Sequence, residues 1–110
     1  MAKKIVAIEV EGKEKHIRLG MNALIELEGI LGKPITAIGG SEVSLSDLRA
    51  MLYVGLKWED KKLTLDTVGD YMDSIIEEKG IKYLSDRLGE ALQGSVGTSA
   101  LPSEQAGLYR

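Results

Sequence analysis

The stretch Met21–Gly32, Met-Asn-Ala-Leu-Ile-Glu-Leu-Glu-Gly-Ile-Leu-Gly, decides the fold because it predicts a helix with both of its ends marked. Asn22 is placed to act as the N-cap, where a side-chain oxygen accepts a hydrogen bond from a free backbone N–H group. Gly32 ends the helix, and Pro34 prevents it from resuming. One side of this predicted helix, over residues 22–32, carries Ala23, Leu24, Leu27, Ile30 and Leu31.

The residues before this helix predict an antiparallel β-hairpin over residues 4–19. Apolar residues recur at every second position of Lys4–Val10, and in Lys13–Leu19 the apolar Ile17 and Leu19 lie on the face opposite polar residues, which is typical of strands with one buried face. Glu11 and Gly12 fit a two-residue turn, because glycine tolerates a positive φ angle. The residues expected on the buried face are Val6, Ile8, Val10, Ile17 and Leu19. A lone hairpin is marginal in water, so this face must pack on helices or on another chain.

The helix predicted over residues 44–58 has the widest apolar surface in the chain. Ser44 and Asp47 mark its start in a capping-box arrangement. More than half of its circumference is apolar, so it must be buried on two sides. It lies either at the centre of the fold or at an interface with a partner.

Two further helices are predicted, over residues 64–79 and 82–93. Thr64 caps the first of them, and Gly80 ends it. The apolar residues expected on one side of the second are Ile81, Leu84, Leu88, Ala91 and Leu92. Residues 94–110 show no periodicity, so we predict a flexible tail.

Length and composition indicate one globular domain, residues 1–93, with a mainly α (α+β) fold in which the hairpin packs on about four helices. The chain has 110 residues, of which 44% are hydrophobic and 28% charged. A net charge of −3 argues against nucleic acid as the main partner. The absence of cysteine fits a reducing cytoplasm. The first apolar run is interrupted by Glu9, so we expect neither a signal peptide nor membrane association.

No motif indicates catalysis, a cofactor or a metal site, and we expect a protein that is not an enzyme. His16 is the single histidine and lies on the polar face of the hairpin, so a structural role is favoured. Four carboxylates share one stripe of the helix over 64–79, at Asp66, Asp70, Asp73 and Glu77. Such a stripe can attract a basic partner or a cation, but a solvated face is the commoner explanation.

The helices over 64–79 and 82–93 also have the outline of a helix-turn-helix, which gives an alternative function as a small DNA-binding or regulatory protein. The second helix offers Lys82 and Arg87 against Asp86 and Glu90. Because the first helix is acidic, it would repel a DNA backbone.

A partner surface is expected from residues of the helices predicted over 22–32 and 44–58. Large aromatic and methionine side chains dominate interface energetics, and the candidates are Met51, Tyr53, Val54 and Trp58. Core packing explains these four as easily. Ile25 points away from the apolar side of its helix, so it is either a tolerated surface residue or a partner contact. The edge of the hairpin is a second candidate for docking.

Glycines inside the predicted helices indicate close helix packing, since each costs about 1 kcal/mol relative to alanine. They are Gly29, Gly55, Gly69 and Gly89.

Six segments, in this order, resemble the small tail assembly chaperones of siphophage-type tails and gene transfer agents. The resemblance covers roughly residues 4–93. The segments are Ile-Arg-Leu-Gly-Met-Asn-Ala-Leu-Ile-Glu-Leu-Glu at 17–28, Leu-Gly-Lys-Pro-Ile at 31–35, Ser-Asp-Leu-Arg at 46–49, Tyr-Val-Gly-Leu at 53–56, Leu-Thr-Leu at 63–65 and Val-Gly at 68–69.

The resemblance implies a non-enzymatic morphogenesis factor of a phage or prophage, acting in the host cytoplasm. Proteins of this family coat the tape measure protein and keep it soluble until tail tube subunits replace it. The resemblance also implies self-association into rings or spirals, and a second, longer product made by programmed frameshifting.

Overall fold

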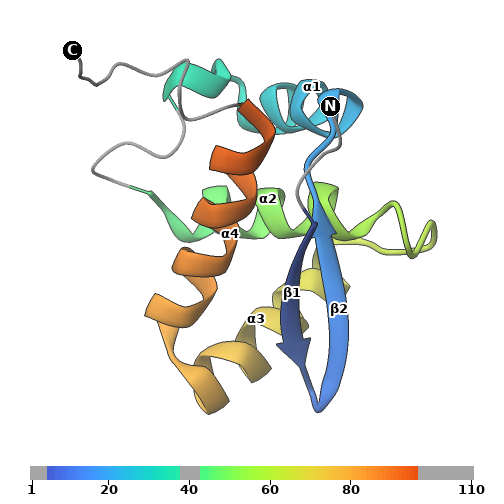
Figure 1. Ribbon diagram of the computed structural model, residues 1–110, viewed down its shortest axis with the longest axis vertical. Coiled ribbons are helices and arrows are strands. Elements are labelled where there is room, and N and C mark those ends of the chain that lie inside the picture. The colour runs from blue at the N-terminus through green and yellow to red at the C-terminus, as the bar shows by residue number, and fades with distance from the viewer. Residues whose placement is uncertain (1–4, 38–42, 97–110) are drawn as a thin grey trace.

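The computed structural model describes residues 5–37 and 43–96, with side chains described up to Gln93. The hairpin is followed by four α-helices, which confirms the mainly α (α+β) fold (Figure 1). In chain order the elements are β1 (Ile5–Val10), β2 (Lys13–Arg18), α1 (Met21–Leu31), the 3₁₀ turn η1 (Ile35–Ala37), α2 (Leu45–Leu56), α3 (Leu65–Lys79) and α4 (Ile81–Val96).

The hairpin has the predicted register, turn and buried face. Val10 pairs with Lys13 across the turn. Glu11 and Gly12 have φ angles of 54° and 77°, and two positive values are the signature of the type I′ turn that matches strand twist. The five predicted residues, Val6, Ile8, Val10, Ile17 and Leu19, are all buried.

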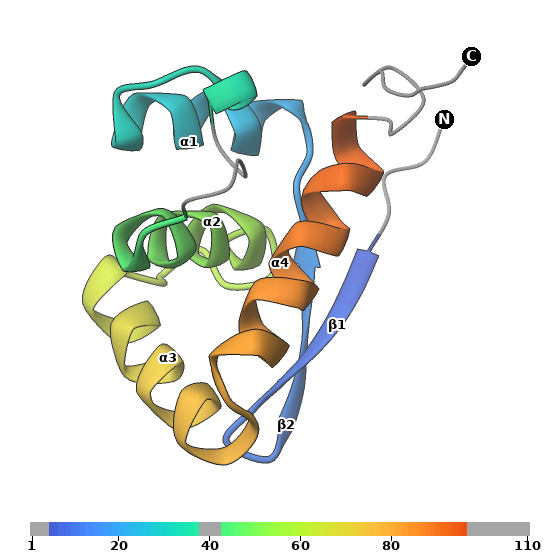
Figure 2. The same cartoon turned by 90° about the vertical axis from the view of Figure 1, so that its left-hand side faces the viewer.

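Helix α2 lies at the centre of the fold. Figure 2 shows α1 on one side of α2 and α3 on the other, with α4 and the hairpin beside them. Helix α2 contacts α1, α3, α4 and β2. Apart from Leu45 at its first position, the wide apolar surface of α2 is therefore covered by the rest of the chain, which is the first of the two alternatives that its sequence left open.

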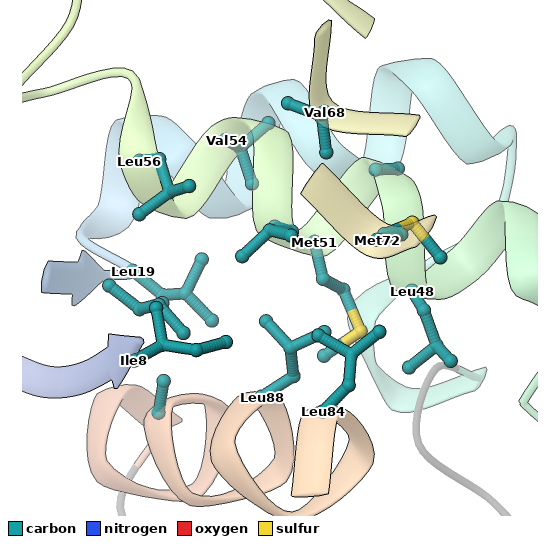
Figure 3. Close-up of a cluster of buried hydrophobic side chains, with 14 of the residues drawn as sticks. Ile8, Leu19, Leu48, Met51, Val54, Leu56, Val68, Met72, Leu84 and Leu88 are labelled. Carbon is teal, nitrogen blue, oxygen red and sulfur yellow. The ribbon is translucent and has the colours of Figure 1, made fainter. Parts of the chain in front are cut away.

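The hydrophobic core joins every element of the hairpin and the four helices. In Figure 3, Met51 of α2 reaches toward Leu84 and Leu88 of α4, while Ile8 and Leu19 enter from the hairpin end. Fully burying a Leu, Ile, Val or Met side chain contributes about 1.5–3 kcal/mol. The hairpin face is thus stabilised by helices of its own chain.

The start of α1 differs from the prediction. Gly20 is the N-cap, with extended backbone and no side-chain hydrogen bond to the cap. The first helical hydrogen bond runs from Leu24 N–H to the Gly20 carbonyl at 2.9 Å, so Asn22 lies inside the first turn and cannot cap it. The predicted stop is confirmed, because Gly32 is left-handed and its N–H donates to Glu28 O at 2.8 Å.

The other helix ends are mostly as predicted. Ser44 and Asp47 form the capping box of α2, Thr64 caps α3, and Gly80 ends α3. Helix α2 stops at Leu56, before the predicted end at Trp58.

Helix α4 is longer than predicted. It begins at Ile81 and continues through residues 94–96, which were assigned to the tail. The remaining tail, 97–110, lies outside the described residues. The apolar sides predicted for α1 and α4 are each wrong at one position, because Ile30 of α1 and Ile81 of α4 are exposed.

Candidate partner-binding surface

The outer edge of β1 is covered by side chains of α4. The N–H group of Glu9 donates to the Tyr83 hydroxyl oxygen at 3.0 Å. Arg87 Nη1 donates to the carbonyl oxygen of Ala7 at 3.2 Å. Another strand cannot pair with these two backbone groups while the α4 side chains hold them.

The outer edge of β2 is covered by the segment that follows α2. Trp58 Nε1 donates to the His16 carbonyl oxygen at 2.9 Å, and the His16 N–H donates to Glu59 Oε1 at 3.2 Å. The expectation that a hairpin edge is open for docking is therefore wrong at the centre of both strands. The covering residues come from distant sequence, so the strand pattern could not reveal them.

The imidazole of His16 joins the hairpin to the same segment. Its Nδ1 lies 3.0 Å from Glu59 Oε2, and its Nε2 lies 2.9 Å from Glu14 Oε2. The hydrogen bond to Glu14, followed in size by the hydrogen bond to Glu59, raises the pKa of His16 above its ordinary 6.5. This contact gives His16 a structural role.

The structure separates the five predicted partner residues. Met51 and Val54 are 2% and 3% exposed, so they belong to the core, although Val54 also lines a surface hollow described below. Tyr53 is partly buried, with Lys57 Nζ 5.0 Å from its ring centroid. Trp58 and Ile25 remain exposed, at 38% and 59%.

The outward side of α1 carries no charged residue. It presents Met21, Asn22, Ile25 and Gly29, and Met21 is 60% exposed. The two acidic residues of α1 lie at its flanks and are engaged within the chain. Glu26 Oε2 accepts from Lys57 Nζ at 2.8 Å, and Glu28 Oε2 accepts from the Ile35 N–H at 2.8 Å. An exposed helix normally places charges outward, so this apolar side is unusual.

A hollow of about 470 Å³ adjoins the first turn of α1. Trp58, Arg18 and Lys61 line it together with Met21 and Glu26. The Arg18 guanidinium carbon lies 5.8 Å from the centroid of the Trp58 ring, which is cation–π distance.

The charge of this hollow is only partly balanced. Glu26 lies 2.8 Å from Lys57, and its hydrogen bond raises the pKa of that lysine. Within the part of the chain that the structure describes, no carboxylate lies at ion-pair distance from Arg18 or Lys61. Two cations therefore remain available to a ligand.

We call the residues Arg18, Met21, Ile25, Gly29, Trp58 and Lys61 the α1–Trp58 surface. Sequence reasoning found Ile25 and Trp58, because one points away from the helix core and the other is a large aromatic residue. It missed Arg18 and Lys61, which are brought to one hollow only by the packing of α2 on β2.

The acidic stripe of α3 is exposed at Asp66, Asp70, Asp73 and Glu77. Among the described residues, no group of three or more carboxylate or imidazole side chains is placed to hold a metal ion. On α4, Lys82 pairs with Asp86 at 2.8 Å and Arg87 is engaged by β1. These contacts leave little positive charge for a DNA backbone, so nothing favours the helix-turn-helix alternative.

The comparisons with protein-family models, curated proteins and solved structures find no match to this chain. Over the described residues, none of the helices is both long and apolar enough to cross a bilayer.

Proposed function

We propose that this protein is a tail assembly chaperone of a phage or prophage. It binds the tape measure protein without catalysing a reaction, and keeps it soluble in the host cytoplasm during tail assembly. The sequence resemblance supplies this identity. The single observation that supports it in the structure is the uncharged outward side of α1, next to an exposed tryptophan.

The physical reason is the combination of apolar exposure and a closed core. Met21, Ile25 and Trp58 place apolar atoms in water on one side of a well-packed fold. Met21 lines one hollow with Trp58 and lies one helical turn from Ile25, and exposed apolar residues gathered in this way favour a protein interaction site. Tryptophan is one of the residue types enriched among the energetic anchors of interfaces. A holdase needs such a surface to cover apolar segments of its client.

Self-association and a longer, frameshifted product belong to the same proposal. Self-association would let several copies cover one long client. The proposal predicts a slippery frameshift site before the stop codon of the gene, and a neighbouring gene that encodes a very long helical protein.

The test is co-expression of this chain with that neighbouring long protein. The proposal predicts that the long protein is insoluble when expressed alone, and that it becomes soluble and co-purifies with this chain. Light scattering after size-exclusion chromatography then reports the number of copies bound. If the chain neither changes the solubility of the long protein nor co-purifies with it, the proposal is wrong.

A further inference from the structure

We infer that the segment bound by the α1–Trp58 surface is an amphipathic α-helix of a partner protein, with carboxylates along one flank. The inference rests on the proposed function only for the identity of the protein that supplies the helix. Its chemistry follows from the side chains and backbone groups that the surface presents.

A helix fits better than a strand because the strand edges of the hairpin are held by side chains. On β1, Tyr83 binds the Glu9 N–H and Arg87 binds the Ala7 carbonyl, and on β2, Trp58 and Glu59 bind the carbonyl and N–H of His16. Strand addition requires a row of free backbone donors and acceptors. The described chain offers an apolar helix side in place of such an edge.

The spacing on α1 suits helix-on-helix packing. Met21, Ile25 and Gly29 follow one another at four-residue intervals, so they form one ridge about 12 Å long at 1.5 Å per residue. Ridges of this type pack into the grooves of a second helix. A Cβ atom added at Gly29 would meet no other atom within 4 Å. Gly29 is therefore not required by packing inside this chain, and it leaves a shallow place where a partner backbone can approach.

The available charges select the flank of the partner helix. Arg18 and Lys61 lie beside the first turn of α1, with no carboxylate of the described residues paired to either. Glutamate or aspartate on the partner helix would complete these pairs, while its apolar stripe covers Met21 and Ile25. Arginine can bind a carboxylate with two parallel hydrogen bonds, which fixes orientation.

Nucleic acid fits the same surface less well. Glu26 lies in the hollow with the cations, and the apolar side of α1 offers phosphate groups no partner. The net charge of −3 also opposes binding to a polyanion.

Trp58 provides the readout, because it is the single tryptophan of the chain. Two synthetic helical peptides without tryptophan are titrated into the full-length protein. They share one apolar stripe and differ only in carrying glutamate or lysine along one flank. We expect the glutamate peptide to shift the Trp58 emission and to bind at least tenfold more tightly than the lysine peptide, with an affinity that falls as salt is added.

Two substitutions assign the charge effect to the hollow. Lys61→Gln should weaken binding of the glutamate peptide about threefold, whereas Lys62→Gln, which changes a neighbouring lysine that does not line the hollow, should leave it unchanged. Circular dichroism of both variants confirms that they remain folded.

Several outcomes would overturn the inference. Equal binding of the two peptides would exclude charge selection. Tight binding of a short DNA duplex, weakened by Lys61→Gln, would assign the hollow to phosphates instead. If neither peptide binds while the long neighbouring protein still co-purifies, the proposed function stands and the inference about the helix is wrong.

Discussion

At Gly55, the packing of α2 on the hairpin leaves the least room for a side chain, so a substitution there should destabilise the fold. A Cβ atom added there would lie 2.6 Å from Ile17 Cγ2 and 3.4 Å from Leu19 Cδ2. Both side chains are fully buried, so α2, β2 or the Ile17 side chain must shift to relieve the first contact. Overpacking of this kind costs about 1–3 kcal/mol. We take about 3 kcal/mol, because the displaced atoms belong to a strand in the core.

Alanine also favours the helix over glycine by about 1 kcal/mol. Gly55→Ala should therefore lower the free energy of unfolding by about 2 kcal/mol in net terms. Gly89→Ala is the matched control, because its Cβ would meet no atom within 4 Å. That change should raise the free energy of unfolding by about 1 kcal/mol.

Thermal unfolding followed by far-UV circular dichroism separates the two changes. At about 4 °C per kcal/mol for a domain of this size, Gly55→Ala should lower Tm by about 8 °C and Gly89→Ala should raise it by about 4 °C. If both substitutions move Tm in the same direction, the close approach of α2 to β2 is not as described, and the central place of α2 is in doubt.

Three further predictions concern the ionisable groups of His16 and Asp47 and the helix position Gly29. The pKa of His16 is raised by its contacts with Glu14 and Glu59, so these contacts stabilise the fold fully below pH 6.5, and their contribution is lost as pH rises through the higher pKa of the folded state. Glu59→Gln should lower the pKa of His16, which NMR signals of the imidazole report. Burial opposes the charge of Asp47, but hydrogen bonds from Lys33 and Ser44 outweigh burial and lower the pKa of Asp47 below 3.8. These hydrogen bonds therefore stabilise the fold above pH 3.8, and their contribution is lost as pH falls through the lower pKa of the folded state. In acid unfolding curves, Asp47→Asn should lose less stability than the wild type. Gly29→Ala should raise the free energy of unfolding by about 1 kcal/mol in urea titrations, yet weaken co-purification with the partner; unchanged co-purification would remove Gly29 from the surface.

Local sequence signals predicted most of the hairpin and the helix ends because they act within a few residues. Glu11-Gly12 selects its turn through backbone angles, and Ser44 with Asp47 caps a helix through neighbouring donors and acceptors. The prediction that Asn22 caps the first helix was wrong, because the N-cap is the residue at which the helical hydrogen bonds begin, and they begin at Gly20.

Properties that depend on packing between distant segments could not be predicted in the same way. The sequence of α2 showed that both sides must be buried, but its apolar pattern is the same for a core and for an interface. The sequence therefore made Met51 and Val54 candidates for partner contacts, whereas the structure places both in the core. Close packing was the predicted reason for the helical glycines. It holds at Gly55 but is wrong at Gly29 and Gly89, where an added Cβ atom would meet no atom within 4 Å.

The candidate site was accessible to sequence reasoning only in part. The position of Ile25 on its predicted helix and the aromatic side chain of Trp58 were enough to predict that these two residues could contact a partner. Arg18 and Lys61 are ordinary surface cations in the sequence, and their shared hollow exists because β2 and the end of α2 lie together.

We propose that the uncharged outward side of α1 binds the client protein. Co-purification of the long neighbouring protein with Ile25→Glu and with Ile81→Glu tests this proposal. Both residues are exposed isoleucines in helices, and Ile81 begins α4 at the end of the fold away from α1 (Figure 2). We expect Ile25→Glu to abolish solubilisation of the client protein, whereas Ile81→Glu should leave it at the wild-type level. Equal activity of the two variants would contradict the proposal.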